Sequence, residues 1–370
     1  MNAQGATVMI TTGGTGGHVF PGLAVATKLL ARGCSVFWLG TREGMEASLV
    51  PQHGVEFESL AFRGIRGKGW RTLLLGPYAL ALACIDSIRI IRRRSPGVVL
   101  GFGGFASFPG ALMGVAAGKP LVVHDANAIA GLANRILAHG ADRVLLGFPG
   151  ALRSARAEWV GNPLRDDIVA VEAPGQRFAN RTGPLRLLVV GGSLGAAALN
   201  EAIPKAVATI DSDARPIIVH QAGERHIDQL RVAYASANVT AECVPFIDDM
   251  AARYAWADIV ICRGGALTMS ELAAVGLGAI VVPLPGAIAD EQTANARFLE
   301  EAGAAIIVAQ AQLTDQGSPI ADILAPLSRD QALTMATAAH RLGKRDAAER
   351  VADACIELAA RRRSRNVEAG

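Results

Sequence analysis

The chain has 370 residues, of which 51% are hydrophobic and 19% charged, and its formal net charge at pH 7 is +3. This length exceeds the size at which one hydrophobic core usually stops growing, so two domains are expected. The small net charge excludes a nucleic-acid-binding protein that relies on its overall electrostatic field.

Short apolar runs alternate with helical segments along the first half of the chain. Helices are predicted over about 17–31 and from about residue 44, and a polar, irregular stretch over 172–184. Strands are predicted over residues 8–10, 36–39, 98–100, 121–124 and 143–146. This alternation is typical of βαβ units in a parallel, doubly wound sheet.

The same alternation restarts after the polar stretch. Strands are predicted over residues 185–190, 217–220, 258–262, 279–283 and 305–308. We therefore expect an α/β protein with two Rossmann-like, doubly wound domains, residues 1–163 and 164–344, whose boundary falls within 162–184. A last helix, over about 345–363, is expected to pack back onto the first domain.

Each predicted domain has a glycine-rich turn between its first strand and the following helix. The turns are Gly13-Gly14-Thr15-Gly16-Gly17-His18 and Gly191-Gly192-Ser193-Leu194-Gly195. The first is neither a GxGxxG dinucleotide fingerprint nor a P-loop. Glycines allow a ligand to approach the backbone, and the N–H groups at a helix start favour an anion or an oxygen-rich group.

His18 is a candidate general base, because imidazole accepts a proton near neutral pH. The alternative is a histidine that caps its helix or bonds to the backbone, and its position within a double-glycine turn favours the base. In the second turn, Ser193 can donate its hydroxyl to a phosphate, and Arg165 can supply a fixed positive charge to a diphosphate.

The segment 262–276 leaves a buried strand, turns on two glycines and starts a helix that carries Thr268 and Glu271. The N-terminus of this helix can hold a phosphate, and Glu271 can accept two ribose hydroxyls. Alternatively, Glu271 is a surface acid that complements the helix dipole.

Metal, disulfide and membrane-spanning features are not expected. The five cysteines show no CxxC spacing and indicate free thiols in a reducing compartment. Asp211-Ser212-Asp213 has the spacing of a metal-binding pair but falls in a polar loop, which indicates a solvated turn. Residues 1–7 do not resemble a secretory signal, and no run of about 18 uncharged apolar residues predicts a transmembrane helix.

Several motifs, distributed over almost the whole chain, together resemble the MurG family. They are Gly13-Gly14-Thr15-Gly16-Gly17-His18-Val19-Phe20-Pro21-Gly22-Leu23-Ala24, Arg66-Gly67-Lys68-Gly69, Gly161-Asn162-Pro163-Leu164-Arg165, Phe246-Ile247-Asp248-Asp249-Met250 and residues 264–276. The resemblance implies the GT-B fold, in which two domains face one another across a deep cleft. UDP-N-acetylglucosamine would bind the C-terminal domain as a substrate, without a cofactor, and a lipid-linked acceptor the N-terminal one.

The resemblance also implies which residues meet the donor. Glu271 would bind the ribose hydroxyls, and the backbone of Ile247 would bind uracil between Phe246 and Met250. The diphosphate would be surrounded by Arg165, Ser193, Ala266, Leu267 and Thr268, and the sugar hydroxyls would face Glu291 and Gln292.

On the acceptor side, the cleft would be lined by Thr15, His18, Asn127 and Gly103-Gly104-Phe105, and Thr15, Gly16, Gly17 and Asn127 would also reach the donor. In inverting transfer, the 4-hydroxyl of the muramoyl sugar loses a proton as it attacks the anomeric carbon opposite the departing UDP. His18 is the first candidate for the base and Asp125 the second. Positive helix ends at Ser193 and Thr268, with Arg165, would stabilise the diphosphate without a metal.

Three places depart from the usual pattern of the family. His124-Asp125-Ala126-Asn127 stands where the family commonly has His-Glu-Gln-Asn, so the carboxylate is one methylene shorter and an amide is lost. Leu194 stands in place of a glutamine, and Gly264 in place of a serine. UDP-N-acetylglucosamine is still expected to bind.

Residues 70–94 combine an apolar helix with a basic rim, a pattern suited to an anionic membrane surface. The alternative is a core helix with a solvated basic end. The surface for the acceptor and the membrane is expected to include Arg66, Lys68, Trp70, Leu74, Tyr78, Gly103, Gly104 and Phe105.

The expected activity is therefore that of an inverting N-acetylglucosaminyltransferase of peptidoglycan synthesis. It would convert undecaprenyl-pyrophosphoryl-N-acetylmuramoyl-pentapeptide (lipid I) to lipid II through a β-1,4 linkage, as a peripheral protein on the cytoplasmic side of the bacterial inner membrane. Expected partners are the anionic membrane surface and other cell-wall synthesis proteins, and no nucleic acid. The alternatives are a GT-B enzyme with a different acceptor and a non-catalytic nucleotide-sugar-binding scaffold.

Overall fold

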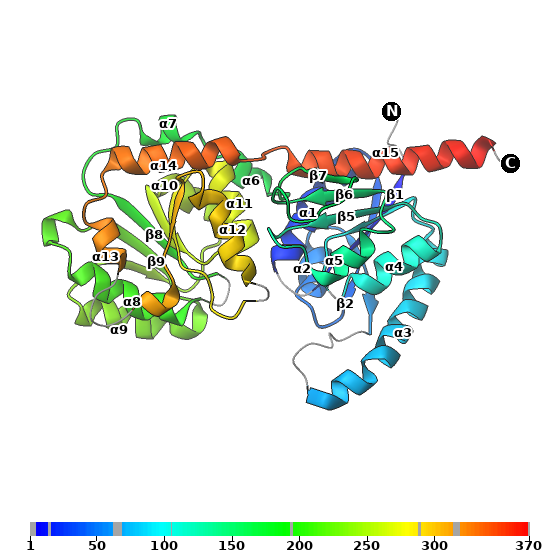
Figure 1. The fold of residues 1–370 in the computed structure, drawn as a ribbon, viewed down its shortest axis with the longest axis horizontal. Helices are drawn as coiled ribbons and strands as arrows, with labels where there is room; N and C mark the ends of the chain where they lie inside the picture. The colour runs from blue at the N-terminus through cyan, green and yellow to red at the C-terminus, as the bar shows by residue number, and fades with distance from the viewer. Residues whose placement is uncertain are drawn as a thin grey trace. The chain divides into compact units, whose positions relative to one another are not determined.

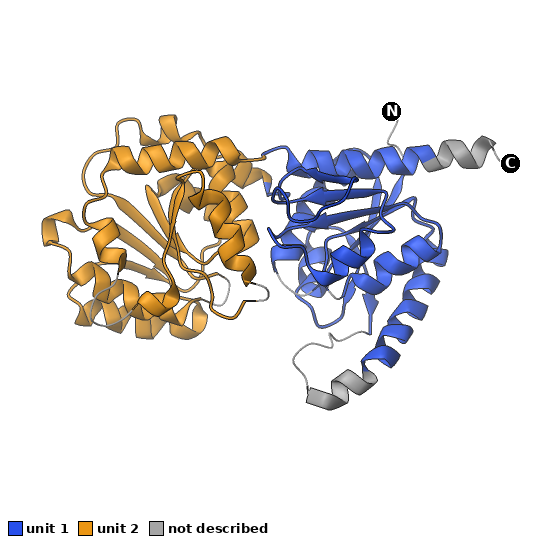
Figure 2. Cartoon of the chain, in the orientation of Figure 1, with its two compact units in different colours: residues 1–165, 345–370 blue, residues 166–344 orange. Residues whose placement is uncertain are grey.

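The computed structural model describes residues 5–13, 16–61, 69–104, 106–192, 195–287, 290–313 and 319–368, and for 69–75 and 362–368 only the helical backbone (Figure 1). Its contacts divide the chain into two compact units (Figure 2). Unit 1 comprises residues 1–165 and 345–370, and unit 2 comprises residues 166–344. Each unit contains one parallel sheet with helices, which confirms the predicted α/β class.

The sheet of unit 1 has seven strands in the order β3-β2-β1-β4-β5-β6-β7. They are β1 (Thr7–Thr11), β2 (Ser35–Thr41), β3 (Glu56–Leu60), β4 (Val98–Gly101), β5 (Leu121–Asp125), β6 (Arg143–Leu146) and β7 (Ala157–Trp159). The order reverses between β1 and β4, where Val8 pairs with Val36 on one side and Val98 on the other. In such sheets, ligands bind at the carboxyl ends of the strands beside this reversal.

Helices cover both faces of this sheet, because successive strand residues point to opposite sides. Val8 and Ile10 pack in one core cluster with α1 (Gly16–Ala31) and α15 (Ala347–Glu368), whereas Met9 packs in the other. The remaining helices of unit 1 are α2 (Glu46–Gln52), α3 (Gly69–Arg94), α4 (Phe108–Ala116) and α5 (Leu132–Leu137).

The C-terminal helix α15 lies against α1 within unit 1. Val351, Cys355 and Leu358 are buried in the same core cluster as Val25 and Leu29. Charged side chains surround this apolar contact: Arg32 pairs with Glu349 and Asp353, and Arg143 with Glu357. Unit 1 is therefore assembled from both ends of the chain.

The sheet of unit 2 has six strands in the order β10-β9-β8-β11-β12-β13. They are β8 (Arg186–Val190), β9 (Ile217–Gln221), β10 (Glu242–Val244), β11 (Ile259–Cys262), β12 (Gly278–Val281) and β13 (Ala305–Ile307). The helices are α6 (Asp166–Val169), α7 (Pro174–Phe178), α8 (Ala197–Ala208), α9 (Ile227–Ser236), α10 (Met250–Trp256), α11 (Ala266–Val275), α12 (Glu291–Glu300), α13 (Pro319–Leu324) and α14 (Arg329–Leu342).

The prediction of an irregular stretch over residues 172–184 is wrong in its middle, where the short helix α7 forms. Pro174 occupies its first turn, a position at which a missing N–H costs nothing. One polar residue of this stretch, Arg177, also has a structural role. Arg177 is buried, and its guanidinium donates to the backbone carbonyls of Glu172, Tyr254, Val275 and Gly276.

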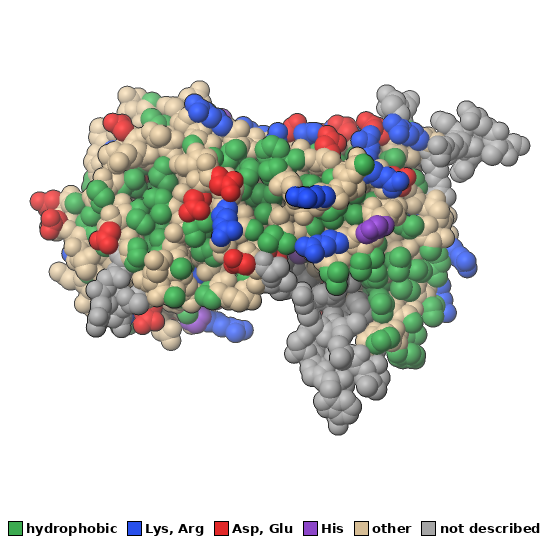
Figure 3. Space-filling model, viewed as in Figure 1, with side chains coloured by type: hydrophobic (Ala, Val, Ile, Leu, Met, Phe, Trp, Pro, Cys, Tyr) green, Lys and Arg blue, Asp and Glu red, His purple; other side chains and the backbone are tan. Residues whose placement is uncertain are grey.

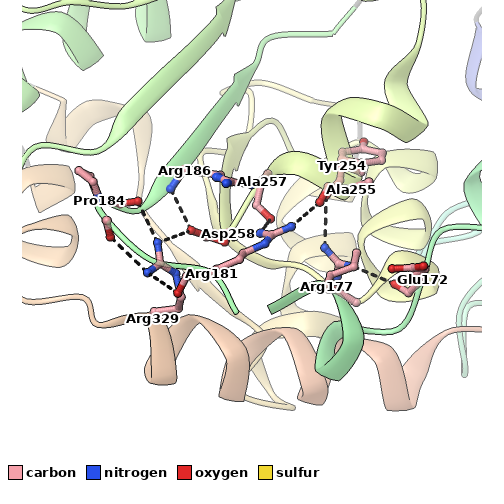
Figure 4. Close-up of polar contacts among 12 residues, drawn as sticks. Glu172, Arg177, Arg181, Pro184, Arg186, Tyr254, Ala255, Ala257, Asp258 and Arg329 are labelled. Carbon is pink, nitrogen blue, oxygen red and sulfur yellow. Dashed lines mark hydrogen bonds and ion pairs between the residues drawn. The ribbon is translucent and has the colours of Figure 1, made fainter. Parts of the chain in front are cut away.

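A buried ion-pair cluster lies beside this helix (Figure 4). Asp258, just before β11, is fully buried and accepts hydrogen bonds from Arg181, from Arg329 at 3.2 Å and from the backbone N–H of Arg186 at 3.0 Å. These contacts attach the segment before β8 and the start of α14 to the central strand β11.

Candidate functional site

In unit 1, the loops that follow β1 and β4 pack directly on each other. A side chain at Gly13 would collide with Ala106, and a Cβ at Gly104, whose φ is +78°, would lie 2.7 Å from the carbonyl oxygen of Gly13. A Cβ at Gly103, whose φ is +85°, would lie equally close to the side-chain amide of Asn134. Glycine is therefore required where these loops meet at the carboxyl ends of the strands.

His18 lies in the first turn of α1, directly after Gly16 and Gly17, and is partly buried. Burial lowers the pKa of His18 below its usual value of 6.5, and the negative charge of Asp125 opposes this effect. The imidazole is therefore neutral at pH 7 and able to accept a proton.

Asp125 ends β5 and is buried, with 3% of its surface exposed. Its carboxylate accepts hydrogen bonds from the backbone N–H groups of Asn127 and Gly131, both at 3.1 Å, and from the side chain of Asn134 at 2.9 Å. Burial raises the pKa of Asp125, and these hydrogen bonds and His18 oppose the rise. These hydrogen bonds from the loop after β5 hold the carboxylate of Asp125 in place. Its negative charge is suited to stabilise a protonated His18.

His124, next to Asp125, is buried and, among the described residues, contacts only other parts of unit 1. It is fully buried, its Nε2 lies 3.0 Å from the carbonyl oxygen of Gly161, and its ring lies against Phe102. Burial lowers the pKa of His124 to about 4, so it stays neutral at pH 7. Of these two histidines, His18 keeps part of the residue's surface exposed, whereas His124 is fully buried.

In unit 2, the glycine turn after β8 is held against the end of β9. Gly192 and Gly195 have φ values of +85° and +76°, and a side chain at Gly195 would collide with the carbonyl of Ala222. Gln221, buried at the end of β9, accepts from Gly191 N–H at 3.2 Å and donates to the carbonyl of Gly192 at 3.0 Å. Gln221 was not singled out from the sequence, although a polar residue ending an apolar strand is a signal for it.

Gln221 also reaches the loop that carries the expected uracil contacts. Its amide donates to the carbonyl of Pro245 at 3.3 Å, directly before Phe246 and Ile247. Phe246 is 51% exposed, so its ring is accessible to a ligand. One buried glutamine thus fixes both the glycine turn and the loop after β10.

The helix α11 starts at Ala266 after the extended residue Gly265, and its first turn holds Ala266, Leu267 and Thr268, all partly buried. Glu271 follows one turn later and accepts a hydrogen bond from the hydroxyl of Tyr254 at 2.9 Å. Tyr254 was likewise not singled out from the sequence. Since α11 presents both free N–H groups and a fixed carboxylate, it can meet a diphosphate and a ribose together.

The start of α12 lies against the turn before α11. A side chain at Gly264 would collide with the carbonyl of Gln292, and Asn295 donates to the carbonyl of Gly264 at 3.1 Å. The side-chain oxygen of Gln292 accepts from the N–H of Leu284 at 2.9 Å. This close approach gives a physical reason for glycine at position 264.

The structure brings His18, Asp125 and Asn127 together in unit 1. In unit 2 it places Gln292 against Gly264, just before α11, which carries Glu271. Arg165 ends unit 1 immediately before α6 and is partly buried. Some expected site residues or their side chains lie outside the described part of the chain: Thr15, Arg66, Lys68, Trp70, Leu74, Phe105 and Ser193.

In the described ranges, neither a metal-binding cluster nor a membrane-spanning helix is found. These ranges hold no group of histidine, cysteine and acidic side chains that could bind a metal ion. Asp211 and Asp213 are exposed around a 3-10 turn over Ser212–Ala214, as expected for a solvated turn. The helices of the same ranges lack the combination of length and hydropathy that a transmembrane span requires.

Comparison with known proteins places both units in one family. Residues 8–146 match the model of the glycosyltransferase family 28 N-terminal domain, and residues 186–351 that of the C-terminal domain. The chain is 54% identical over 356 residues to the UDP-N-acetylglucosamine–N-acetylmuramyl-(pentapeptide) pyrophosphoryl-undecaprenol N-acetylglucosamine transferase of Ralstonia nicotianae, covering 95% of this chain and 96% of the relative. It is also 54% identical to the enzyme of the same name from Aromatoleum aromaticum, covering 97% and 99%.

A solved structure supports the same family. The crystal structure of Acinetobacter baumannii MurG is similar to this chain with a TM-score of 0.83 and 35% identity, and the match covers 95% of this chain and 99% of that one. The GT-B fold expected from the sequence is thereby confirmed.

Proposed function

The chain belongs to glycosyltransferase family 28 and, within it, to the MurG family, and on this premise we propose how its residues carry out the reaction. It transfers N-acetylglucosamine from UDP-N-acetylglucosamine to undecaprenyl-pyrophosphoryl-N-acetylmuramyl-pentapeptide in peptidoglycan synthesis. The observation that carries this function is the match over nearly the full length of relatives with this activity.

In unit 1, His18 acts as the general base. Its neutral imidazole removes the proton from the 4-hydroxyl of the muramoyl sugar while the oxygen attacks the anomeric carbon of the donor. The bond from that carbon to the diphosphate breaks on the opposite face, UDP departs with the electron pair, and the configuration inverts. Asp125 stabilises the positive charge that His18 gains, as its electrostatic coupling to His18 supports.

In unit 2, the donor is held by α11 and the two loops fixed by Gln221. The N-terminal turn of α11 faces the diphosphate with unsatisfied N–H groups and the positive end of the helix dipole, and Arg165 adds a full charge. Glu271 accepts the ribose hydroxyls, and the loop with Ile247 holds the uracil. Gln292 meets the sugar.

The acceptor is tested by supplying radiolabelled UDP-N-acetylglucosamine with alternative acceptors. We expect label in the muramoyl lipid and none in diacylglycerol. Transfer to diacylglycerol alone would favour an enzyme with a different acceptor. Donor binding without transfer to any acceptor would favour a nucleotide-sugar-binding scaffold.

Replacing Glu271 with alanine should weaken binding of UDP-N-acetylglucosamine by about 1.5–3 kcal/mol, the value of hydrogen bonds to a charged group. Calorimetric titration measures the change. Glu201→Ala is the matched control, since this acid lies exposed on α8 of the same unit and pairs only with Lys205 among the contacts described. Unchanged affinity in Glu271→Ala would overturn the ribose assignment.

We further propose that α3 rests on the membrane from the cytoplasmic side. Tyr78, Leu82 and Ile85 are 67%, 44% and 44% exposed and follow one another at helical spacing. Hydrophobic side chains gather over α3 and α4 on the face drawn in Figure 3. Arg89 continues the stripe and pairs with Asp86, and Arg93 and Arg94 pair with Glu58 and Glu56 of β3, so the basic rim is partly neutralised.

Leu82→Glu combined with Ile85→Glu should remove most of the binding to vesicles that contain anionic phospholipid, because both charges would enter the headgroup layer. Cosedimentation measures the bound fraction. The control is Val232→Glu, at a 64% exposed position on α9 of unit 2. Equal binding of the double variant and the wild type would show that α3 is not the contact.

A further inference from the structure

Tyr254 lies on α10 and points its hydroxyl toward the neighbouring helix. Only 1% of this residue is exposed, and a buried phenol needs a hydrogen-bond partner for its hydroxyl. The hydroxyl donates to Oε2 of Glu271 on α11 at 2.9 Å. Glu271 itself is only partly buried.

This hydrogen bond restricts the side chain of Glu271. Glutamate has three rotatable bonds, and an unrestrained carboxylate on a helix would sample several rotamers. An ionised carboxylate has about four acceptor positions on its two oxygens. The bond from Tyr254 uses one of these positions, on Oε2.

Tyr254 is in turn held by its own helix and by Arg177 (Figure 4). Arg177 donates to the carbonyl of Tyr254 at 3.3 Å and to that of Val275, at the end of α11, at 3.1 Å. A single guanidinium thus joins the C-terminal parts of α10 and α11. At the other end of α10, Asp249 caps the helix by accepting from Ala252 N–H at 2.9 Å.

The helix α10 therefore connects two parts of the donor site. The loop with Ile247 comes immediately before it, and Tyr254 contacts Glu271 from its last turn. The contacts proposed for the base and the ribose are thus joined by one helix, which Asp249 caps and Arg177 ties to α11. A ligand lacking a ribose hydroxyl would lose its hydrogen bond to Glu271, and the bond from Tyr254 opposes a rearrangement of the carboxylate.

We propose that Tyr254 is a positioning residue that sets the preference of this enzyme for a ribose over a deoxyribose nucleotide, by fixing the carboxylate of Glu271. The inference rests on the proposed role of Glu271 in binding the ribose. Tyr254 does not touch the nucleotide itself and acts through Glu271.

The test compares the affinities of the full-length protein for UDP and 2′-deoxy-UDP by calorimetric titration. The ratio of the two affinities is the readout, because it is insensitive to the fraction of protein that is folded. We expect wild type to prefer UDP and Glu271→Ala to lose most of the preference. Tyr254→Phe, which removes only the hydroxyl, should reduce the ratio by about 3- to 10-fold, the effect of one hydrogen bond.

A double variant and a matched control complete the test. Tyr254→Phe should reduce the ratio no further in the Glu271→Ala background, because the tyrosine acts through that carboxylate. Tyr234→Phe is the control: this tyrosine is also buried in unit 2, but its hydroxyl bonds to His220 at 2.9 Å, so its loss should leave the ratio unchanged.

Each contrary result would overturn a different step of the proposal. A wild-type ratio in Tyr254→Phe, alongside a reduced ratio in Glu271→Ala, would overturn the positioning role. An equal effect of Tyr254→Phe with and without Glu271 would overturn it as well. A wild-type ratio in Glu271→Ala would instead contradict the proposed ribose contact.

Discussion

Replacing His18 with alanine is expected to lower kcat by about 10²- to 10⁴-fold, the usual contribution of a positioned general base. The affinity for UDP-N-acetylglucosamine should change little, because the contacts proposed for the uracil and the ribose come from residues of unit 2. Steady-state kinetics with the muramoyl lipid and calorimetric titration with the donor measure the two effects separately. Normal turnover in His18→Ala would remove His18 as the base.

His53→Ala is the matched control for this variant. His53 follows α2 in unit 1, is exposed, and its Nδ1 lies 2.9 Å from the carbonyl oxygen of Leu49. Its loss should leave kcat unchanged.

The pH profile gives an independent check on the same residue. A base must be neutral to act, so kcat/KM should fall as the pH drops through the pKa of His18. Burial outweighs the charge of Asp125 and places this pKa below 6.5. Asp125→Asn removes the charge that raises it, so the acidic limb should move to still lower pH. A limb that does not move would mean that Asp125 has no influence on the base.

Replacing Asp258 with alanine is expected to lower the free energy of unfolding by about 3–5 kcal/mol, because it leaves two partly buried guanidinium groups without their negative charge. Asp258 is fully buried, and both Arg181 and Arg329 pair with it. The backbone N–H of Arg186 would lose its acceptor as well. Urea denaturation followed by circular dichroism measures the loss.

An exposed ion pair of the same unit provides the comparison. Arg253 pairs with Glu242, whose side chain is 50% exposed, and solvent weakens such a pair. Glu242→Ala should therefore cost no more than about 1 kcal/mol. If the two variants unfold at the same urea concentration, the Asp258 cluster does not stabilise unit 2.

Local patterns predicted the central strands closely. The first strand was expected over residues 8–10 and forms over Thr7–Thr11, and the first helix was expected over about 17–31 and forms over Gly16–Ala31. The edge strand β3 was not predicted. Its sequence, Glu56-Phe57-Glu58-Ser59-Leu60, is mostly polar because an edge strand is less buried than a central one.

Some residues of the candidate site could be predicted from the sequence and others could not. His18, the glycine turns and the segment with Glu271 could be found from the sequence, because their signals lie within a few residues of each other. Gln221 and Tyr254 could not, because their partners are 30 and 17 residues away respectively and meet them only through the order of strands and helices.

The amino-acid sequence by itself determined two α/β units, their glycine turns and the family, since apolar periodicity and motif spacing are local properties of the chain. The tertiary structure alone decided how distant residues combine: α15 with α1, Arg177 with the ends of α10 and α11, and Tyr254 with Glu271. Such pairings are selected because buried polar groups must find partners, and those partners exist only once the sheets and helices have packed.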